Sequence, residues 1–370
     1  VALGMGANIN DIMRAIAPLQ DISPTDPKAQ DAWWTNWNAA GERLDGVAAD
    51  YAAQGLWLAA QHSHIRASAM YSLAERMLPL DDLRKNKAHT ASIHALCASE
   101  AACALAGASH SFTYLHFPYG EHTLSGYLYK PANTAATMPC AIALNGFDGT
   151  KELAYLSGFA EAMGARGIAS FIIDQPGTGE ALRRHNMPLE IESEHAAGAA
   201  YDFIANDPHI DAGRIAIVGQ SLGGYYAPRA AAMDDRFAAC IAWAGFYSMQ
   251  LYYEQENPSA EGLPGIMEYA FRAYGVANEQ ELVEKALKLT LVPVLDKIKV
   301  PFLCAHGGND QQTGPLHATR AVAGAVNSPN AKAHIFTEDE GASEHCGVDN
   351  LALVNAYRAD WLAQQFAPAA

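Results

Sequence analysis

The sequence predicts an α/β fold in which a mostly parallel sheet carries an antiparallel hairpin at one edge and follows a helical N-terminal module. Three observations predict this fold. Up to about residue 109, apolar residues recur at intervals of three and four with almost no β-branched runs, which is typical of helices. Residues 110–131 alternate between apolar and polar side chains, as the strands of a hairpin do. Six short apolar runs then alternate with helical segments, which indicates a parallel sheet covered on both faces.

The N-terminal module contains helical patterns at 31–44, 50–78 and 89–106. Its large aromatic residues are Trp33, Trp34, Trp37, Trp57 and Tyr71. Such side chains more often pack between helices than bind a ligand, although together they would also suit the lining of an apolar pocket. We expect residues 1–109 to form a helical cap on a core made by residues 110–370.

The core begins with the hairpin, which turns at Tyr119-Gly120-Glu121 and ends at Pro131. The six apolar runs that follow are Cys140 to Leu144, Ile168 to Ile173, Arg214 to Val218, Ala239 to Trp243, Pro301 to Ala305 and Ala333 to Phe336. More than fifty residues separate the fourth run from the fifth, which is too many for a simple crossover. Because this interval contains helical patterns, we expect a helical insertion at about 247–297 that lies above the sheet as a lid.

The stretch 214–228 has the order of elements that surrounds a nucleophilic serine. An apolar, strand-like run leads into G-x-S-x-G, formed by Gly219, Ser221 and Gly223, and an Ala-rich segment able to form a helix follows. Glycine is needed at the flanking positions because a side chain there would collide with the adjoining strand and helix. A bare G-x-S-x-G also occurs by chance, and the competing interpretation is an ordinary strand-to-helix turn. The strand before it and the helix after it favour a catalytic serine.

An acid and a base follow in the order that this elbow requires. Ligands of open parallel sheets bind beyond the carboxyl ends of the strands, and Asp310 and His345 come after the fifth and sixth apolar runs. The chain order serine, acid, histidine is that of the serine elbow. We therefore expect His345 to act as general base for Ser221 and Asp310 to orient the imidazole. Three further carboxylates compete for the role of the acid, namely Asp339, Glu340 and Glu344. His306 is interpreted as a structural loop histidine.

Two glycine-containing loops follow the first and second apolar runs. In Asn145-Gly146-Phe147-Asp148-Gly149, the N–H of Phe147 could form an oxyanion hole with the N–H of Leu222, although a glycine-rich loop without a catalytic part is the alternative. The second loop, from Asp174 to Glu180, contains G-x-G but lacks the further glycine and the lysine of a phosphate loop. We expect it to be a tight loop that shapes the site.

The charge of the chain and the spacing of its polar residues argue against two classes of function, nucleic-acid binding and metal or cofactor binding. It carries 24 Lys and Arg against 40 Asp and Glu, a net charge of −16. Its one dense basic run, Arg84, Lys85 and Lys87, is interpreted as a solvated helix end or loop, so we expect no nucleic-acid binding. His, Asp and Glu do not recur at metal-binding spacings, and we expect no metal and no cofactor.

The cysteines and the apolar runs indicate a compartment. The six cysteines form no C-x-x-C pair, and Cys140, Cys240 and Cys304 lie in apolar runs, where buried free thiols are the usual finding. The first residues show no charged segment followed by an apolar one, and no apolar run approaches the about 20 residues of a membrane span. We expect a cytoplasmic protein without membrane contact that acts on a small molecule.

With Ser221, Asp310 and His345 in this order, the chain resembles the α/β-hydrolase superfamily. It is similar in particular to the branch that contains 2,6-dihydroxypseudooxynicotine hydrolase and the fungal hydrolases that shorten aromatic polyketides. The segments that carry this resemblance are G-F-D-G-T-K-E from Gly146, D-Q-P-G-T-G-E from Asp174, G-Q-S-L-G-G-Y from Gly219 and E-H-C from Glu344. Because the helical module matches as well, the resemblance extends over nearly the whole chain. The resemblance implies an α/β-hydrolase fold with an N-terminal helical cap, and a homodimer.

The resemblance also implies a reaction. In the nicotine-degrading relatives, a glutamate before an x-Pro pair assists cleavage of a carbon–carbon bond, and Glu256 in Glu256-Asn257-Pro258 matches it, with Glu254 as a competitor. A solvated lid residue is an equally consistent interpretation of Glu256. We expect hydrolysis of an acyl–aromatic carbon–carbon bond, with ester or lactone hydrolysis as the alternative because both need Ser221 and His345. The alternative of another class is a noncatalytic receptor on a hydrolase scaffold.

Overall fold

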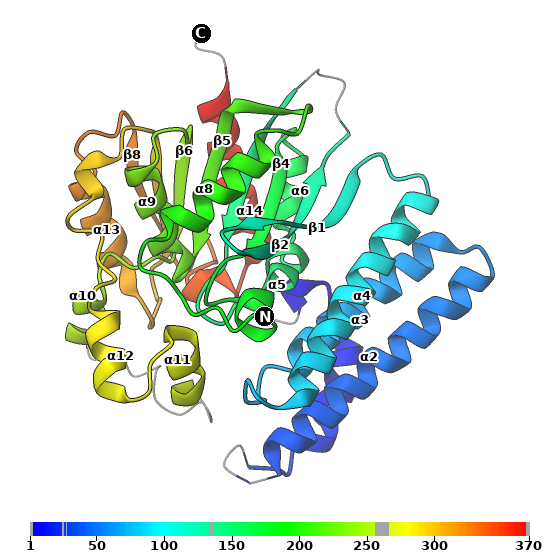
Figure 1. The fold of residues 1–370 in the computed structure, drawn as a ribbon. Helices are drawn as coiled ribbons and strands as arrows, with labels where there is room; N and C mark the ends of the chain where they lie inside the picture. The colour runs from blue at the N-terminus through cyan, green and yellow to red at the C-terminus, as the bar shows by residue number, and fades with distance from the viewer. Residues whose placement is uncertain (1–2, 24–25, 27, 133–136, 256–265, 368–370) are drawn as a thin grey trace.

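A computed structural model describes residues 3–23, 26, 28–132, 137–255 and 266–367 of the chain (Figure 1). Within these ranges, eight strands form one sheet in the order β1-β2-β4-β3-β5-β6-β7-β8. The strands are β1 (Ser111–Tyr119), β2 (His122–Lys130), β3 (Met138–Leu144), β4 (Ala169–Asp174), β5 (Ile210–Gln220), β6 (Ala239–Trp243), β7 (Phe302–Gly307) and β8 (Ala331–Phe336). The hairpin β1-β2 lies at one edge and pairs antiparallel with β4, whereas the other neighbours are parallel. The predicted fold class is confirmed.

The central strands are buried because their sequences are apolar on both faces. Every residue of β3, β4 and β6 is buried. Successive side chains of a strand point to opposite faces, and accordingly Ile217 and Val218 of β5 belong to two different apolar clusters. The sheet is thus the middle layer of three, which is the arrangement that the apolar runs predicted.

Helices cover both faces of the sheet (Figure 1). The core helices are α5 (Lys151–Leu156), α6 (Phe159–Gly164), α7 (Gly179–Arg183), α8 (Glu194–Ile204), α9 (Gly223–Met233), α13 (Gly314–Gly324) and α14 (Leu351–Phe366). One apolar cluster contains Ala197 of α8 and Ala227 of α9, and the other contains Phe159 of α6 and Leu362 of α14. The two pairs of helices therefore pack on opposite faces.

The N-terminal part of the chain is helical, as expected, with α1 (Ile9–Ile16), α2 (Ala29–Ala53), α3 (Trp57–Ala74) and α4 (Leu83–Leu105). The pattern predicted as one helix at 50–78 is divided, because α2 ends near Gly55, whose φ of 71° suits glycine and few other residues. Trp37 and Tyr71 are buried in the apolar cluster that also contains α6 and α14. These aromatic residues therefore pack between elements.

A buried ion network joins α4 to the core. The ammonium of Lys151 lies 2.9 Å from Glu152, 3.1 Å from Asp174 and 2.6 Å from Glu180. Nε2 of His89, on α4, lies 2.9 Å from Oε2 of Glu152. The helical segment is thus attached to the core by buried polar and ionisable side chains.

One prediction about charge is wrong. Lys85, which was placed in a solvated basic run, is buried, and its ammonium lies 2.8 Å from Glu75. It also donates hydrogen bonds to the carbonyls of Glu75 and Leu78, at 2.8 and 3.1 Å. A basic run looks solvated in the sequence because nothing there indicates that a distant carboxylate and a helix end will meet one of its members.

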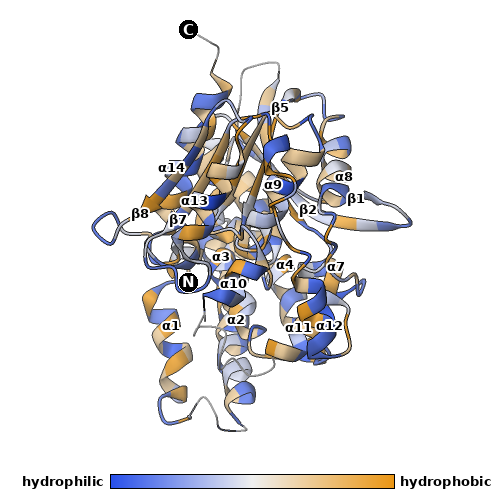
Figure 2. Cartoon of the chain, turned by 90° about the vertical axis from the view of Figure 1, so that its left-hand side faces the viewer, coloured by the Kyte–Doolittle hydropathy of each residue, from blue (hydrophilic) through white to orange (hydrophobic). Residues whose placement is uncertain are grey.

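The predicted insertion contains α10 (Met249–Glu254), α11 (Ile266–Tyr274), α12 (Glu279–Ala286) and the short 3₁₀ turn Leu295–Lys297. Figure 1 and Figure 2 show α11 and α12 below the sheet, on the side where α2 also lies. Figure 2 shows both hydrophilic and hydrophobic stretches on these two helices. No helix in the described ranges is both long enough and apolar enough to cross a bilayer.

Candidate active site

Ser221 occupies the turn between β5 and α9 in a backbone conformation that few residues other than glycine adopt. Its φ is +55°. Its N–H donates to the carbonyl of Trp243 at 2.8 Å, and its carbonyl accepts from the N–H of Gly224 at 2.7 Å. These two bonds hold the strained residue in place.

The two glycines of the elbow are required by close packing, as the sequence predicted. A Cβ on Gly219 would lie 1.8 Å from the carbonyl oxygen of Gly223, and a Cβ on Gly223 would lie 2.5 Å from the carbonyl oxygen of Leu144. No side chain fits at either position, because both distances are far below van der Waals contact.

The structure brings the three predicted residues together in one hydrogen-bonded chain. Nε2 of His345 lies 3.0 Å from Oγ of Ser221, and Nδ1 of His345 lies 2.8 Å from Oδ2 of Asp310. Asp310 follows β7, and His345 opens a short 3₁₀ turn after β8. The competing carboxylates at 339, 340 and 344 are exposed, whereas the buried Asp310 holds the ring.

Asp310 is fixed from several sides. Its Oδ1 accepts the N–H groups of Gln312 and Thr313, at 2.8 and 3.0 Å, and its Oδ2 accepts the hydroxyl of Thr313 at 2.9 Å. Burial raises the pKa of this carboxyl, but the bonds to His306 and His345 outweigh burial and hold the pKa well below its usual range. Asp310 is therefore an ionised carboxylate.

His306 differs from its predicted place. It is the fifth residue of β7 and not a loop residue, and its buried Nε2 lies 2.9 Å from the Thr313 hydroxyl and 3.2 Å from Oδ2 of Asp310. The strand is longer than the apolar run indicated because a buried histidine can continue a strand when its ring finds polar partners. In the sequence, the spacing of four residues between His306 and Asp310 was the signal that could have indicated their contact.

His345 has a perturbed affinity for protons. Burial lowers the pKa of its imidazole, whereas the neighbouring Cys346 and the hydrogen bond to Asp310 raise it, and the net effect is a raised pKa. An imidazole between a carboxylate and a hydroxyl has the arrangement of a general base that stabilises its own protonated form.

The predicted oxyanion loop lies against Ser221. A Cβ on Gly146 would lie 2.9 Å from Cβ of Ser221, so the loop packs directly on the serine. Leu222 is the N-cap of α9, where the first N–H groups of a helix have no partner within the helix. Within the described residues, the N–H groups of Phe147 and Leu222 donate no hydrogen bond to another protein group.

Family models match most of the chain. Residues 156–368 match the model of the prolyl oligopeptidase family, and residues 29–257 match the model "Esterase FrsA-like". Each match covers more than half of the 370 residues. The chain belongs to these α/β-hydrolase families. It is therefore a hydrolase, and the alternative of a noncatalytic receptor is disfavoured.

Two relatives of this α/β-hydrolase come from fungi. A 20-hydroxy-prefusarin hydrolase of Gibberella moniliformis is 32% identical over 250 residues, which are 65% of this chain and 57% of that protein. The hydrolyase poxO of Penicillium oxalicum is 27% identical over 342 residues, 79% of this chain and 77% of that one. The chain thus matches little more than half the length of the first relative.

A solved structure has the same fold. The 2,6-dihydroxy-pseudo-oxynicotine hydrolase superposes with a TM-score of 0.79 over 98% of this chain and 94% of its own, at 22% identity. The resemblance that the sequence motifs predicted is confirmed for the superfamily and for this branch.

The proposed auxiliary acid of this α/β-hydrolase lies outside the described residues. Glu256 belongs to the undescribed range 256–265. Its competitor Glu254 is exposed at the end of α10, and its carboxylate accepts a hydrogen bond from the side chain of Gln250 at 2.8 Å.

The loop after β4 is tight, as expected, and it supports the oxyanion loop. The buried carboxylate of Asp174 accepts from the Asn145 side chain at 3.0 Å and from the N–H groups of Lys151 and Glu180 at 2.8 and 2.9 Å. A Cβ on Gly179 would lie 2.0 Å from Cγ of Asp174, so glycine is required there.

Two groups of potential metal ligands occur in the described residues, and neither includes the site residues. Glu100, Cys103 and His110 form one group, and His89, Glu152 and Asp174 form the other. In the first, His110 and Tyr155 already donate to Glu100, each at 2.8 Å. In the second, the ammonium of Lys151 supplies a cation.

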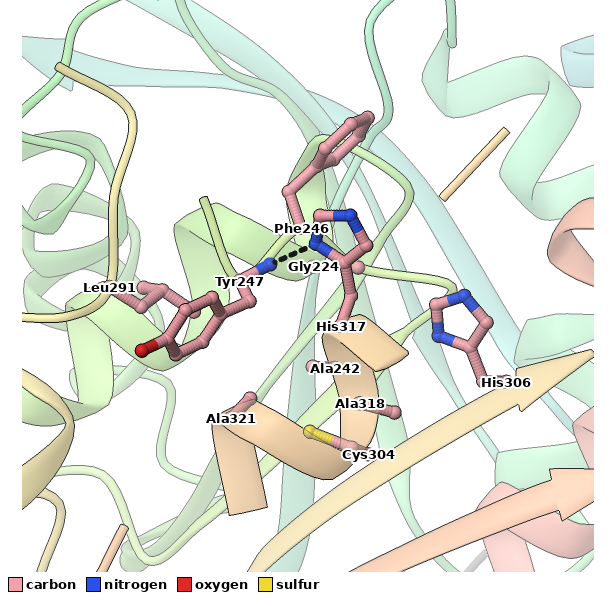
Figure 3. Close-up of a pocket in the computed structure, with 11 residues that line it drawn as sticks. Gly224, Ala242, Phe246, Tyr247, Leu291, Cys304, His306, His317, Ala318 and Ala321 are labelled. Carbon is pink, nitrogen blue, oxygen red and sulfur yellow. Dashed lines mark hydrogen bonds between the residues drawn. The ribbon is translucent and has the colours of Figure 1, made fainter. Parts of the chain in front are cut away.

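A cavity of about 10 Å³ lies between β7 and α13 (Figure 3). His306 and His317 line it, and the N–H of Tyr247 donates to Nδ1 of His317 at 2.9 Å. The ring of His317 therefore carries its proton on Nε2, and burial lowers its pKa to about 4. The cavity has room for about one water molecule, so it is too small to receive a substrate.

Proposed function

We propose that the enzyme is a serine hydrolase that forms an acyl-enzyme on Ser221. The observation that carries this proposal is the hydrogen-bonded chain from the strained serine through His345 to the ionised Asp310. A serine hydroxyl is a weak nucleophile unless an oriented base takes its proton, and this arrangement supplies the base and its orientation.

In the proposed reaction, Oγ of Ser221 attacks a carbonyl carbon while His345 takes the proton on Nε2. Asp310 fixes the ring through Nδ1 and stabilises the imidazolium. The N–H groups of Phe147 and Leu222 receive the oxyanion. His345 then returns the proton to the leaving group, and a water molecule, activated by the same ring, hydrolyses the acyl-enzyme.

The proposed substrate is a hydrophobic, aromatic small molecule. Aromatic rings of the insertion border the oxyanion loop, since Tyr269 and Tyr274 have their ring centroids 5.0 and 5.9 Å from that of Phe147. Such surroundings favour flat apolar compounds. The names of the similar hydrolases, which refer to prefusarin and to dihydroxy-pseudo-oxynicotine, support a small-molecule substrate.

The preferred reaction is hydrolysis of an acyl–aromatic carbon–carbon bond. The carbon–carbon bond of the tetrahedral intermediate breaks, its electron pair goes to the ring carbon, and a proton must reach that carbon. A carbanion is a poor leaving group, so this reaction needs an acid in addition to the triad. We propose Glu256 for this role, on the sequence match alone.

Ester or lactone hydrolysis is the second candidate. The match to the FrsA-like esterase model favours it, and an alkoxide leaving group needs no acid other than His345. The two candidates share Ser221, His345 and Asp310, and they differ only in the need for a further acid.

Product analysis by mass spectrometry separates the candidates. The panel pairs aromatic β-dicarbonyl compounds and acyl-phenols with aryl esters and macrolactones, and Ser221→Ala serves as the blank. We expect Glu256→Gln to lose ketone cleavage while it keeps ester turnover, and the matched control Glu254→Gln to keep both. If only esters or lactones react and Glu256→Gln has no effect, the enzyme is an esterase or lactonase.

A further inference from the structure

The oxyanion loop, residues 145–150, is held at both ends by the core. The N–H of Asn145 donates to Oε1 of Gln175 at 3.1 Å, and Nε2 of Gln175 donates to the carbonyl of Asn145 at 2.8 Å. At the other end, the N–H of Lys151 donates to Asp174 at 2.8 Å. All four residues are buried, so the ends of the loop do not move independently of the sheet.

In the middle of the loop, the ring of Phe147 packs against the core cluster, but within the described residues no hydrogen bond from the sheet or its covering helices reaches the backbone of Phe147 or Asp148. Phe147 and Asp148 stand between Gly146, which packs on Ser221, and Gly149, whose carbonyl accepts the N–H of Gly179 at 3.3 Å. Within the loop itself, one turn hydrogen bond joins the N–H of Gly149 to the carbonyl of Gly146, at 3.2 Å. The direction of the Phe147 N–H therefore depends on contacts from other parts of the chain.

The insertion supplies one of these contacts. The hydroxyl of Tyr269, on α11, donates to the carbonyl of Phe147 at 3.0 Å. The two rings meet edge to face, with an angle of 76° between their planes. Burial raises the pKa of the Tyr269 phenol above its ordinary range, so the hydroxyl keeps its proton and remains a donor.

The helical N-terminal part supplies the other contact. Arg76, just beyond the end of α3, forms an ion pair with Asp148, and this carboxylate raises the pKa of the guanidinium. The residue before it, Glu75, is buried and accepts a hydrogen bond from Arg183 at 2.7 Å, which fixes the chain that carries Arg76. Two neighbouring residues of the oxyanion loop are thus held by two different units.

We propose that Tyr269 and Arg76 are positioning residues that aim the N–H of Phe147 at the oxyanion. The proposal rests on the proposed function, in which that N–H stabilises the tetrahedral intermediate. An oxyanion donor is effective only when its direction is set before the charge develops. Because one positioning residue lies on the insertion and the other follows α3, the oxyanion hole is complete only when both units are docked on the core.

The test uses Tyr269→Phe, which removes one hydroxyl, and Arg76→Gln, which removes one charge. The readouts are the kinetics of 4-nitrophenyl acetate hydrolysis and the rate at which a fluorophosphonate labels Ser221, followed by intact mass. Loss of a whole oxyanion donor lowers kcat by about 10²–10³-fold, and a donor that is present but loosely held costs less, so we expect a fall of about 5- to 20-fold for each variant. We expect KM to change less than about twofold, and the labelling rate to fall in parallel with kcat.

Matched controls separate this effect from general damage. Tyr201→Phe removes a hydroxyl that donates to the carbonyl of Ala212 at 2.8 Å, near the opposite end of β5 from Ser221. Arg166→Gln removes a guanidinium that pairs with Asp360 at 2.5 Å, just before β4 begins. Both should keep the activity of the unmodified enzyme, and Arg76→Lys should restore part of what Arg76→Gln loses.

The outcomes distinguish this proposal from the proposed function. Unchanged kcat in Tyr269→Phe and Arg76→Gln, together with an inactive Ser221→Ala, would overturn the positioning role alone. A raised KM at constant kcat would also overturn it, because it would make Tyr269 a contact for the substrate. Absence of labelling in the unmodified enzyme, or full activity in Ser221→Ala, would overturn the proposed function and the positioning role with it.

Discussion

His306 and His345 share one oxygen of Asp310: Nε2 of His306 lies 3.2 Å from Oδ2, and Nδ1 of His345 lies 2.8 Å from the same atom. The oxygen that orients the proposed general base is thus itself held by a second, fully buried histidine. Because β7 carries His306, the position of the acid is tied to the sheet and not only to the loop in which Asp310 lies.

Replacement of His306 by Phe keeps most of the ring volume and removes the donor to Asp310. We expect the free energy of unfolding to fall by about 1–3 kcal/mol, because a buried carboxylate oxygen and the Thr313 hydroxyl lose a partner. We expect kcat to fall by about 3- to 10-fold, or about 1 kcal/mol of transition-state stabilisation. Urea titration and steady-state kinetics measure the two effects. His306→Gln, which can still donate, should lose less of both, and equal losses in the two variants would show that the bond to Asp310 is not responsible.

The pH dependence of the reaction follows from the pKa values of His345 and Asp310. The base works only when neutral, and its pKa is raised above 6.5. We therefore expect kcat/KM to rise with pH and to reach half of its maximum above pH 6.5. Asp310, with a lowered pKa, should add no second limb down to about pH 4. Cys346→Ser should move the limb to lower pH, since Cys346 contributes to the raised pKa of His345.

The two pKa shifts, of His345 and of Asp310, make the free energy of unfolding change with pH in opposite directions. His345 has a raised folded pKa, so its contribution is complete below about pH 6.5 and is lost as the pH rises through the folded value. Asp310 has a lowered folded pKa, so its contribution is present above about pH 3.9 and is lost as the pH falls through the folded value. Urea unfolding of the unmodified enzyme and of Asp310→Asn across this range separates the two, and a variant that loses stability equally at low and neutral pH would contradict the assignment to Asp310.

From the ion network around Lys151, we predict an effect on stability rather than on catalysis. Burial lowers the pKa of this ammonium, but the neighbouring carboxylates outweigh burial and hold it above its usual range. Lys151→Met would leave those carboxylates buried without their shared cation, and we expect a loss of about 3–5 kcal/mol in the free energy of unfolding. Urea titration measures it, with the exposed Lys299→Met as control. A loss below about 1 kcal/mol would mean that water or protons replace the ammonium.

Local patterns were sufficient to predict the sheet and the meeting of Ser221, His345 and Asp310. The apolar runs that became β3, β4 and β6 are buried on both faces, and G-x-S-x-G has a steric reason that depends on few neighbours. Asp310 and His345 could be found because chain order and strand ends determine where such residues meet.

Contacts between distant segments could not be predicted in this way. The pair of Lys85 with Glu75, the pair of Arg76 with Asp148 and the bond from Tyr269 to Phe147 each depend on how helices outside the sheet dock. No pattern in the sequence indicates that these residues will meet, because any of these polar residues would also suit a solvated surface. The division of the helical pattern at Gly55 was missed for a related reason, since a single glycine can lie within a helix as well as end one.

The last prediction concerns the backbone strain at Ser221. Its φ of +55° costs a residue with a side chain about 1–2 kcal/mol, and glycine escapes this cost. Ser221→Gly and Ser221→Ala both remove the proposed nucleophile, so both should be inactive, but only Ser221→Gly removes the strain. Glycine gives back about 0.5–1 kcal/mol through the greater freedom of the unfolded chain. We therefore expect Ser221→Gly to be more stable than Ser221→Ala by about 1 kcal/mol in urea titration. If Ser221→Ala is the more stable of the two, the elbow holds no strain of this size, and the two hydrogen bonds of the Ser221 backbone to Trp243 and Gly224 are enough to account for its conformation.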